Sequence, residues 1–410
     1  MSTPVYDLLI VGGGPAGLSA AVEARRLGVK TVAVIDREPQ FGGIPRHCNH
    51  IGFGWKDLHR CLYGPNYAHR RMMMAKDAGV SLLSETTAIG WPAALTLKTT
   101  GPEGLRELSA RAILLTTGCR ERPRAARLIA GNRPAAGIYT TGSLQQSVYF
   151  YSKKPGSKAV VVGAEHVSFS AVHTLRLCGV TVVGMVTEHR SHQSYPLLKW
   201  LIPGCGLRCN AKIIEILGRQ RVEAVRISID GRTEDIACDT VVFTGDWIVD
   251  NELARLGKLS LDQGTLGPRT DWQMRTVHHG VFAAGNCLHG AETAGIAACE
   301  GLTAARSASA FLKGNAWPSD SPVYLEAQKP ILWIFPNLLR PRNTVSSFTV
   351  RVSRFLEQGR FEIKQGGQLL GYTTCGGVVP NRSIHLVIRW DSMPESAAAP
   401  LAISYKETTL

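Results

Sequence analysis

A cysteine flanked by two histidines lies early in the chain, in the run Arg46-His47-Cys48-Asn49-His50. These residue types can form a redox thiol, a metal-binding pair or an acid–base site. Metal binding is disfavoured, because zinc signatures need paired ligands on both sides and the only other nearby cysteine is Cys61. Two interpretations stay open, ordinary polar packing and the lining of an active site. In the second, Arg46, His47, Cys48 and His50 are the candidate catalytic residues.

A glycine-rich turn precedes this run and follows an apolar stretch typical of a buried strand. The turn has the sequence Gly12-Gly13-Gly14-Pro15-Ala16-Gly17. In a dinucleotide-binding turn the first glycine allows the tight bend, the second lets the backbone approach a pyrophosphate, and the third packs helix on strand. A helix should follow, and Asp36 should end the next strand as the acid that binds a ribose hydroxyl. The pattern predicts a nucleotide site.

Three later segments can complete that site. The first is the glycine pair Gly42-Gly43, which implies close approach of the backbone to a bulky group, and the second is the strand 112–118, which ends in Thr117-Gly118. The third is the run 277–286, a strand that leads to Gly285-Asn286, followed by a helix of small residues that Thr293 should cap. The N-terminus of this helix favours anions.

The opening pattern repeats at residues 158–168, but imperfectly. Gly163 takes the first glycine place, whereas Glu165 and Ser168 take the second and third. An inward-pointing carboxylate would repel a diphosphate, and this makes NAD(P) binding at the second fold doubtful. The next strand, Val180 to Val186, ends near Glu188, so the fold itself should persist.

Composition narrows the function further. The net charge is +14, but the basic residues are dispersed, and short clusters such as 120–124 and 340–342 contain no aromatic residues, which argues against nucleic-acid binding. No apolar run reaches the ~18 residues of a membrane helix. The N-terminal sequence has no export signal, and ten cysteines in a chain of this kind are typical of free thiols. We therefore expect a cytoplasmic protein without a transmembrane segment.

The strand and helix patterns indicate an α/β fold with two Rossmann-like dinucleotide-binding domains and a small C-terminal β domain. The polar, loop-like composition between Pro134 and Lys158 predicts a domain boundary there, and Pro318 and Pro322 mark another. The expected domains are 1–133, the first part of the first nucleotide-binding domain; 134–250, the inserted second domain; 251–315, the return to the first domain; and 316–410, the β-rich domain.

The order of these motifs along the chain resembles that of flavoproteins of the pyridine nucleotide-disulfide oxidoreductase type, over about residues 5–315. This resemblance implies a fold similar to that of glutathione reductase. The resemblance implies that the first fold binds FAD, with Asp36 at the adenosine ribose and Gly285-Asn286 near the ribityl and phosphate region. The helix after Thr293 would point its N-terminus at the flavin ring. The implied cofactor-binding residues are Gly12, Gly13, Gly14, Pro15, Ala16, Gly17, Asp36, Arg37, Gly42, Gly43, Thr117, Gly118, Gly285, Asn286, Thr293 and Ala294. Flavoproteins of this type usually have aspartate where this chain has Asn286.

Disulfide reductases of this family carry two cysteines, spaced C-x4-C or C-x2-C, and this chain has neither pair. Dithiol chemistry is therefore not expected, since thiol exchange needs a resolving partner. The segments 43–48, 117–123 and 292–295 are similar to α-type FAD subunits of heteromeric dehydrogenases, of the opine and proline dehydrogenase, hydrogen cyanide synthase and sarcosine oxidase type. Only Cys375 follows residue 315, so that region cannot hold an iron–sulfur cluster.

These features predict an FAD-dependent oxidoreductase subunit. It would act on an amino acid, amine or hydroxy acid and pass electrons to partner proteins, namely a second flavoprotein, an iron–sulfur protein or both. Two alternatives remain: a self-sufficient NAD(P)H-dependent flavin reductase, and a non-catalytic flavin-binding scaffold subunit.

Overall fold

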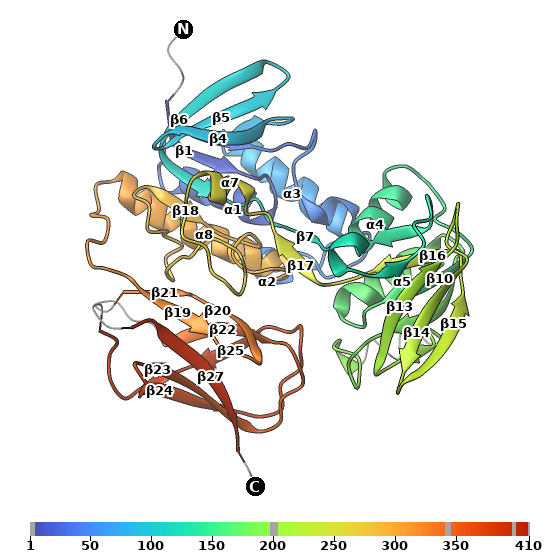
Figure 1. The fold of residues 1–410 in the computed structure, drawn as a ribbon. Coiled ribbons are helices and arrows are strands. Elements are labelled where there is room, and N and C mark those ends of the chain that lie inside the picture. Colours follow the sequence, from blue (N-terminus) through green and yellow to red (C-terminus); the bar gives the residue numbers. More distant parts are fainter. Residues whose placement is uncertain (1–4, 197–203, 341–345, 396–398, 409–410) are drawn as a thin grey trace. The chain divides into compact units, whose positions relative to one another are not determined.

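The computed structural model describes residues 5–196, 204–340, 346–395 and 399–408 (Figure 1). The chain forms two compact units. The first contains residues 1–46, 51–119 and 249–410, and the second contains residues 47–50 and 120–248. The chain passes between the units at β7 (Cys119–Glu121) and β17 (Trp247–Val249), which pair with each other. No helix in the described part of the chain has the length and apolar character needed to cross a bilayer.

The first unit is built on a seven-stranded sheet with the order β3-β2-β1-β6-β5-β4, in which β18 also pairs with β6. Its strands are β1 (Val5–Val11), β2 (Val32–Ile35), β3 (Ser81–Leu83), β4 (Thr87–Ala93), β5 (Thr96–Gly101), β6 (Gly104–Leu115) and β18 (Val281–Ala283). The strands that surround β1 are parallel, whereas β4, β5 and β6 form an antiparallel extension. The second half of β1 and all of β2 are buried, as in a sheet covered on both faces.

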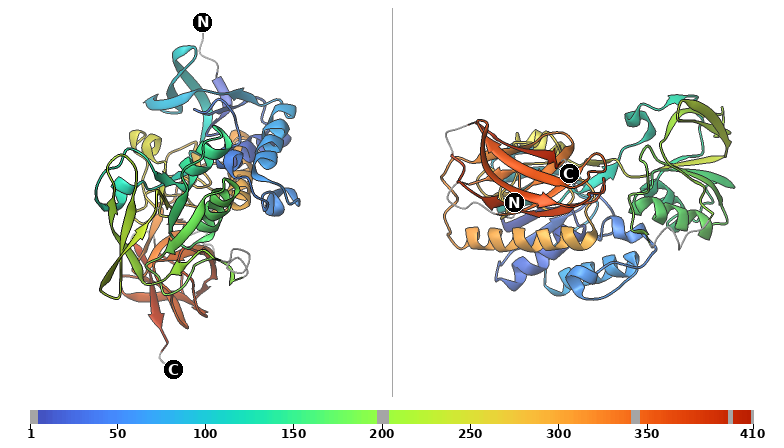
Figure 2. Two further views of the ribbon diagram at one scale, coloured as in Figure 1. Left: turned by 90° about the vertical axis from the view of Figure 1, so that its right-hand side faces the viewer. Right: turned by 90° about the horizontal axis from the view of Figure 1, so that it is seen from below.

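Helices α1 (Pro15–Arg26) and α8 (Ala294–Leu312) lie side by side in the first unit (Figure 2). A glycine makes this possible, since a Cβ atom on Gly301 would lie 2.1 Å from the backbone oxygen of Ala16. The remaining helices are α2 (Trp55–Leu58), α3 (Gly64–Asp77), α7 (Glu252–Leu256) and a 3-10 helix over Ile44–His47. The predicted Thr293 cap is confirmed, because its hydroxyl accepts a hydrogen bond from Ile296 N.

The C-terminal part of the first unit is a β structure of two sheets, which confirms the predicted β region. One sheet has the order β21-β19-β27-β23-β24-β26, and the other has the order β20-β22-β25. The strands are β19 (Val323–Ala327), β20 (Ile331–Phe335), β21 (Leu338–Leu339), β22 (Ser347–Val352), β23 (Gly359–Gln365), β24 (Gln368–Cys375), β25 (Ile384–Val387), β26 (Arg389–Trp390) and β27 (Leu401–Glu407). They enclose their own apolar core. The basic cluster 340–342 lies partly outside the described residues.

The second unit also has a parallel sheet, with the order β12-β11-β10-β16-β9, and an adjoining sheet with the order β15-β14-β13-β8. The parallel strands are β9 (Ile138–Thr140), β10 (Lys158–Val162), β11 (Thr181–Val186), β12 (Leu207–Arg208) and β16 (Thr240–Phe243). The other sheet contains β8 (Ala130–Gly131), β13 (Ala211–Leu217), β14 (Ala224–Ile229) and β15 (Arg232–Ala237). The helices in its described residues are α4 (Thr141–Tyr149), α5 (His166–Leu177) and a 3-10 helix over Arg124–Arg127. Together the two units confirm the predicted α/β fold with two Rossmann-like domains.

The structure corrects the prediction of a loop-like segment at residues 134–158. This segment contains β9 and α4, whose N-cap Thr140 and third residue Ser143 form a reciprocal capping box. Only Thr141, Leu144 and Gln145 of α4 are buried, and only one of these three is apolar. The sequence of α4 therefore lacks the periodic apolar residues that predict a helix. The second unit accordingly begins at Arg120, well before residue 134.

Candidate functional site

The first glycine turn lies between β1 and α1 and contacts the end of β6. Gly12 has a φ of +107°, and a Cβ atom there would lie 2.3 Å from the Thr116 backbone oxygen. A Cβ atom on Gly17 would lie 2.0 Å from the Gly12 oxygen. The Thr116 hydroxyl donates to the backbone oxygens of Val11 (2.9 Å) and Gly12 (2.8 Å). Two of the three glycines are therefore required by close packing.

The remaining glycine of the motif, Gly14, has a different role. Gly14 is the N-cap of α1, has no side-chain cap, and adjoins open space, since a Cβ atom there would meet only Gly43 Cα at 4.0 Å. No acidic residue lies in the first turn of α1. Beside this turn, Asp36 follows β2 and accepts a hydrogen bond from Gly13 N (2.6 Å). Uncapped helix amides, open space and an adjacent carboxylate are what a dinucleotide needs at its pyrophosphate and ribose.

Two sequence-distant turns approach the same place. Gly42 N donates to the Gly13 oxygen (2.8 Å), and a Cβ atom on Gly43 would lie 2.9 Å from Gly14 Cα. A Cβ atom on Gly285 would lie 2.8 Å from the Cβ of Ala16. The predicted glycines 42, 43 and 285 thus meet at the start of α1, although more than 240 residues separate 42 from 285.

Thr117, Gly118 and Arg37 lie together around Asp250. The Thr117 hydroxyl donates to the Asp250 oxygen (2.6 Å), and Asp250 N donates to the Gly118 oxygen (2.8 Å). Arg37 forms an ion pair with the Asp250 carboxylate (3.3 Å). These three predicted cofactor-binding residues therefore hold the chain where it returns to the first unit.

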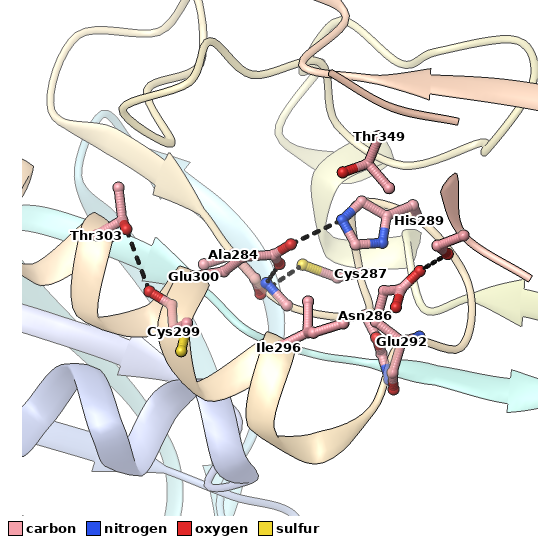
Figure 3. A network of polar contacts seen from close by, with 12 residues as sticks. Ala284, Asn286, Cys287, His289, Glu292, Ile296, Cys299, Glu300, Thr303 and Thr349 are labelled. Atoms are coloured by element: carbon pink, nitrogen blue, oxygen red, sulfur yellow. Dashed lines mark hydrogen bonds and ion pairs between the residues drawn. The ribbon is translucent and has the colours of Figure 1, made fainter. Parts of the chain in front are cut away.

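Asn286 is committed to the loop that leads into α8 (Figure 3). Its Oδ1 accepts from Glu292 N (2.9 Å) and its Nδ2 donates to the Glu292 oxygen (3.2 Å). The neutral amide can do both, whereas an aspartate could only accept. Asparagine at this position therefore fixes the residue that directly precedes Thr293 and Ala294 at the start of the helix.

The Glu292 side chain is held by the C-terminal β structure. Its carboxylate pairs with Arg351 of β22 (3.1 Å) and accepts a hydrogen bond from Ser383. The Arg351 guanidinium also donates to the backbone oxygens of Gly290 (2.7 Å) and Ala291 (3.1 Å). Both charged side chains are buried, 9% exposed for Arg351 and 6% for Glu292. Burial raises the pKa of Glu292, and Arg351 opposes that rise.

A second buried pair joins the same loop to α8. His289 Nε2 lies 2.9 Å from the Glu300 carboxylate, whose other oxygen accepts from Gly285 N (2.9 Å) (Figure 3). The His289 ring stacks on Trp333 of β20, over which Arg351 also lies. Burial lowers the pKa of His289, but the Glu300 carboxylate outweighs it, so the pKa is raised overall. Sequence reasoning missed this network, because its members are far apart in sequence and follow no motif.

The four candidate catalytic residues belong to two units. Arg46 is the last residue of the first chain segment of the first unit. Its guanidinium contacts the Gln40 backbone oxygen and forms an ion pair with Glu38 (3.6 Å). His47, Cys48 and His50 belong to the second unit. The His47 ring meets Phe150 edge-on, and Cys48 Sγ lies 3.5 Å from Gln145 Oε1 of α4. Burial raises the pKa of the Cys48 thiol to about 12. His47 and Cys48 thus pack against α4.

Cysteines 61, 178, 238, 287, 299 and 375 are free thiols. Within the described ranges, no three histidine, cysteine or acidic side chains are grouped so as to hold a metal ion.

Comparisons with known proteins agree with this architecture. The chain is 28% identical over 349 residues to an opine oxidase subunit of Agrobacterium tumefaciens (strain Ach5), covering 75% of this chain and 66% of that protein. It is 25% identical over 372 residues to the alpha subunit of sarcosine oxidase from Rhizobium meliloti (strain 1021), covering 81% of this chain and 34% of that protein. The chain therefore spans about two thirds of the one relative and about a third of the other.

Among solved structures, thioredoxin reductase of Lactococcus lactis has a similar fold, with a TM-score of 0.64 and 18% identity over 76% of this chain and 100% of that one. The profile of the pyridine nucleotide-disulphide oxidoreductase family matches residues 6–301, which contain both glycine turns and the return to Gly285. The chain belongs to the pyridine nucleotide-disulphide oxidoreductase family.

Proposed function

We propose that this chain is the FAD-binding component of a multi-component dehydrogenase. It oxidises an amino acid, amine or hydroxy acid and passes the electrons to a partner, which is a second flavoprotein, an iron–sulfur protein or both. Flavoprotein oxidoreductase chemistry is common to the family, which binds FAD, and the similar opine and sarcosine oxidase chains are themselves subunits. The substrate class is taken from those relatives.

The observation that carries the proposal is the open start of α1. Gly14 leaves the helix amides uncapped next to Asp36, while Gly43 and Gly285 bring two distant segments to the same turn. We assign the FAD pyrophosphate to the turn from Gly12 to Ala16 and the adenosine ribose to Asp36. Gly285 would adjoin the ribityl region. The residues present fit the cofactor.

The start of α8 supplies the second part of the assignment. Bound flavin supplies hydride and electron transfer, and the protein contributes binding, orientation and electrostatics. The N-terminus of α8 carries a partial positive charge, which stabilises negative charge placed near it. Asn286 fixes that terminus through Glu292, and Arg351 fixes Glu292 in turn. These side chains act as positioning residues in the proposed site.

Dithiol chemistry is not part of this proposal. A disulfide reductase needs a thiolate and a resolving thiol. The Cys48 thiol is buried against Gln145, and its pKa of about 12 keeps it protonated at neutral pH. The other candidate residues, Arg46, His47 and His50, remain predictions as active-site lining.

A matched pair of variants tests FAD binding. The visible spectrum of the purified chain, with added FAD if needed, should show bound flavin. Gly14→Glu should bind FAD roughly 100- to 1,000-fold more weakly, since a like-charge contact near 4 Å costs about 4 kcal/mol at a surface dielectric. The fold should tolerate it, because Glu165 has almost the same backbone angles at the start of α5 as Gly14.

Gly90→Ala is the control, as no atom lies within 4 Å of a Cβ atom there, and it should bind FAD like the native chain. A colourless native chain that takes up no added FAD would refute the proposal. Flavin binding by a folded Gly14→Glu variant with native affinity would refute the assignment of the pyrophosphate. The dehydrogenase activity is tested by assaying the chain with its co-purifying partners against amino acids, amines and hydroxy acids, and reduction of the flavin by none of them would refute that part.

A further inference from the structure

The glycine turn of the second Rossmann-like fold matches that of the first at one constant offset along the chain. Gly163 matches Gly12, and both have a positive φ, +129° and +107°. Gln193 N donates to the Ala164 oxygen (2.9 Å), just as Gly42 N donates to the Gly13 oxygen (2.8 Å). A threonine directly follows the neighbouring strand in each fold and donates to the first-strand backbone, Thr116 to Val11 and Thr244 to Val162. The two folds can therefore be compared residue by residue.

The difference between them lies at the second glycine place. Glu165 stands where the first fold has Gly14, with φ −88° against −82°. Its Oε2 accepts from Ala164 N (3.0 Å), and its Oε1 lies 2.7 Å from the Thr244 hydroxyl, whose one hydrogen it shares with the Val162 oxygen. Cβ atoms built on Gly163 and Gly245 would lie 2.8 Å and 2.3 Å from Glu165 Oε1. The carboxylate thus folds back into the turn.

Two further positions carry side chains where the first fold has glycine. Ser168 stands at the third glycine place. Its hydroxyl forms a hydrogen bond with the Thr244 hydroxyl (2.7 Å) and accepts another from Glu165 N (3.2 Å). Ser194 takes the place of Gly43, and its hydroxyl lies 2.5 Å from Nδ1 of His166, the first residue of α5. Both serines are buried. The second turn therefore carries side chains at three places where the first fold has glycine, and of these three only the place of Gly14 borders open space in the first fold.

Electrostatics favour the carboxylate in this position. The Arg127 guanidinium donates to the backbone oxygens of Thr244 (3.0 Å) and Gly245 (2.7 Å), which adjoin Glu165. Burial lowers the pKa of Arg127, and the charge of Glu165 is among those that oppose this lowering. A helix N-terminus attracts an anion, and here the chain supplies one itself.

We propose that the Glu165 carboxylate occupies the pyrophosphate position of the second fold as an internal substitute for phosphate, so that this fold does not bind NAD(P). The inference concerns the second unit alone and does not depend on FAD binding by the first. Combined with the proposed function, it means that the electron acceptor is a redox partner other than a nicotinamide nucleotide.

The first experiment measures binding of NADH, NADPH and ADP-ribose to the full chain by isothermal titration calorimetry. The native chain should bind none of them with a Kd below about 1 mM. Binding of NADH or NADPH in the micromolar range by the native chain saturated with FAD would overturn the proposal, because the first turn is then occupied.

Three variants then separate occupancy from charge. Glu165→Ala empties the position and should strengthen binding of at least one nucleotide tenfold or more over the native chain. Glu165→Gln removes the charge but fills the same volume, so it should remain closed. Glu188→Gln removes an exposed acid near the end of β11 and should also show no gain.

Circular dichroism must first show that each variant is folded. A folded Glu165→Ala variant that gains no binding would overturn the role of Glu165, and an equal gain in Glu165→Gln would overturn occupancy as its cause. If Glu165→Ala does not fold, Glu165→Gly provides the same test with the residue found in the first fold.

Discussion

Replacing Arg351 by methionine tests whether the C-terminal β structure fixes the loop before α8. Methionine keeps much of the apolar length of arginine but removes the cation and its donors. The carboxylate of Glu292 would then keep Ser383 as a partner but lose its countercharge, and the backbone oxygens of Gly290 and Ala291 would lose a donor. The variant therefore removes this buried ion pair together with the hydrogen bonds to the two backbone oxygens.

The expected cost is large because both partners are buried. Removing one member of a buried ion pair typically costs about 3–5 kcal/mol, since the other charge remains without compensation. With side chains 9% and 6% exposed, solvent can screen the remaining charge only slightly. We expect the free energy of unfolding of Arg351→Met to fall by about 3 kcal/mol or more. An exposed control, Arg354→Met, should change it by less than about 0.5 kcal/mol.

The pH dependence of this cost has a definite sign. Burial raises the pKa of Glu292 above its ordinary value of 4.5. A folded state that holds a proton more tightly than the unfolded state gains stability at low pH and loses it as the pH rises through the folded pKa. Without Arg351 that pKa should rise further. The Arg351→Met variant should therefore be destabilised more at pH 8 than at pH 5.

Urea denaturation followed by tryptophan fluorescence, at both pH values, measures these differences. The double variant Arg351→Met/Glu292→Gln provides the decisive comparison, because a neutral amide needs no countercharge. In the Glu292→Gln background the arginine substitution should cost only about 1 kcal/mol, the value of its lost hydrogen bonds. An equal cost in both backgrounds, or a cost of Arg351→Met no larger than that of Arg354→Met, would refute the reasoning.

Two further predictions concern buried titratable groups. The Glu300 carboxylate raises the pKa of His289 above 6.5, so this pair stabilises the fold below pH 6.5 and the effect is lost as the pH rises through the folded pKa. Glu300→Gln should lower the unfolding free energy by about 1.5–3 kcal/mol at pH 6 and by less at pH 9, and urea titrations showing a pH-independent cost would contradict this. At pH 8, iodoacetamide should label the exposed Cys61 while Cys48, with a pKa of about 12 and roughly one thiolate in 10,000, stays unmodified. Mass spectrometry of the folded protein checks this, and equal labelling of the two would contradict it.

The glycine positions were predictable from sequence because their requirement is local. A turn that needs a positive φ or a missing Cβ leaves a mark at a fixed spacing, as at Gly12 and Gly17. The same applies to the departure at Glu165, which the spacing alone made visible. Sequence could not show where that carboxylate points, and only the contacts with Ala164 and Thr244 establish that it fills the turn.

Other features left no local mark. Helix α4 was not predictable from sequence, and its segment was predicted to be a loop. The reason is that its exposed face is polar and only Thr141, Leu144 and Gln145 are buried. The buried ion pair of Glu292 with Arg351 joins residues that are 59 positions apart. Glu292 lies in the loop before α8, and Arg351 lies on strand β22. Side chains that meet only through tertiary packing cannot be paired from periodicity, which reports the face of an element and not its neighbour.

Comparing the two folds of this chain separates what the architecture requires from what a ligand requires. Gly12 and Gly163 are retained together, with a threonine at the end of the neighbouring strand in each, because both folds must close the same turn. Gly14, Gly17 and Gly43 are not retained, and of these three only the place of Gly14 borders open space in the first fold. A glycine that the fold can replace with glutamate at the same backbone angles is not there for the backbone. The space left open in one copy and filled in the other therefore supports the proposal that the first turn receives a phosphate.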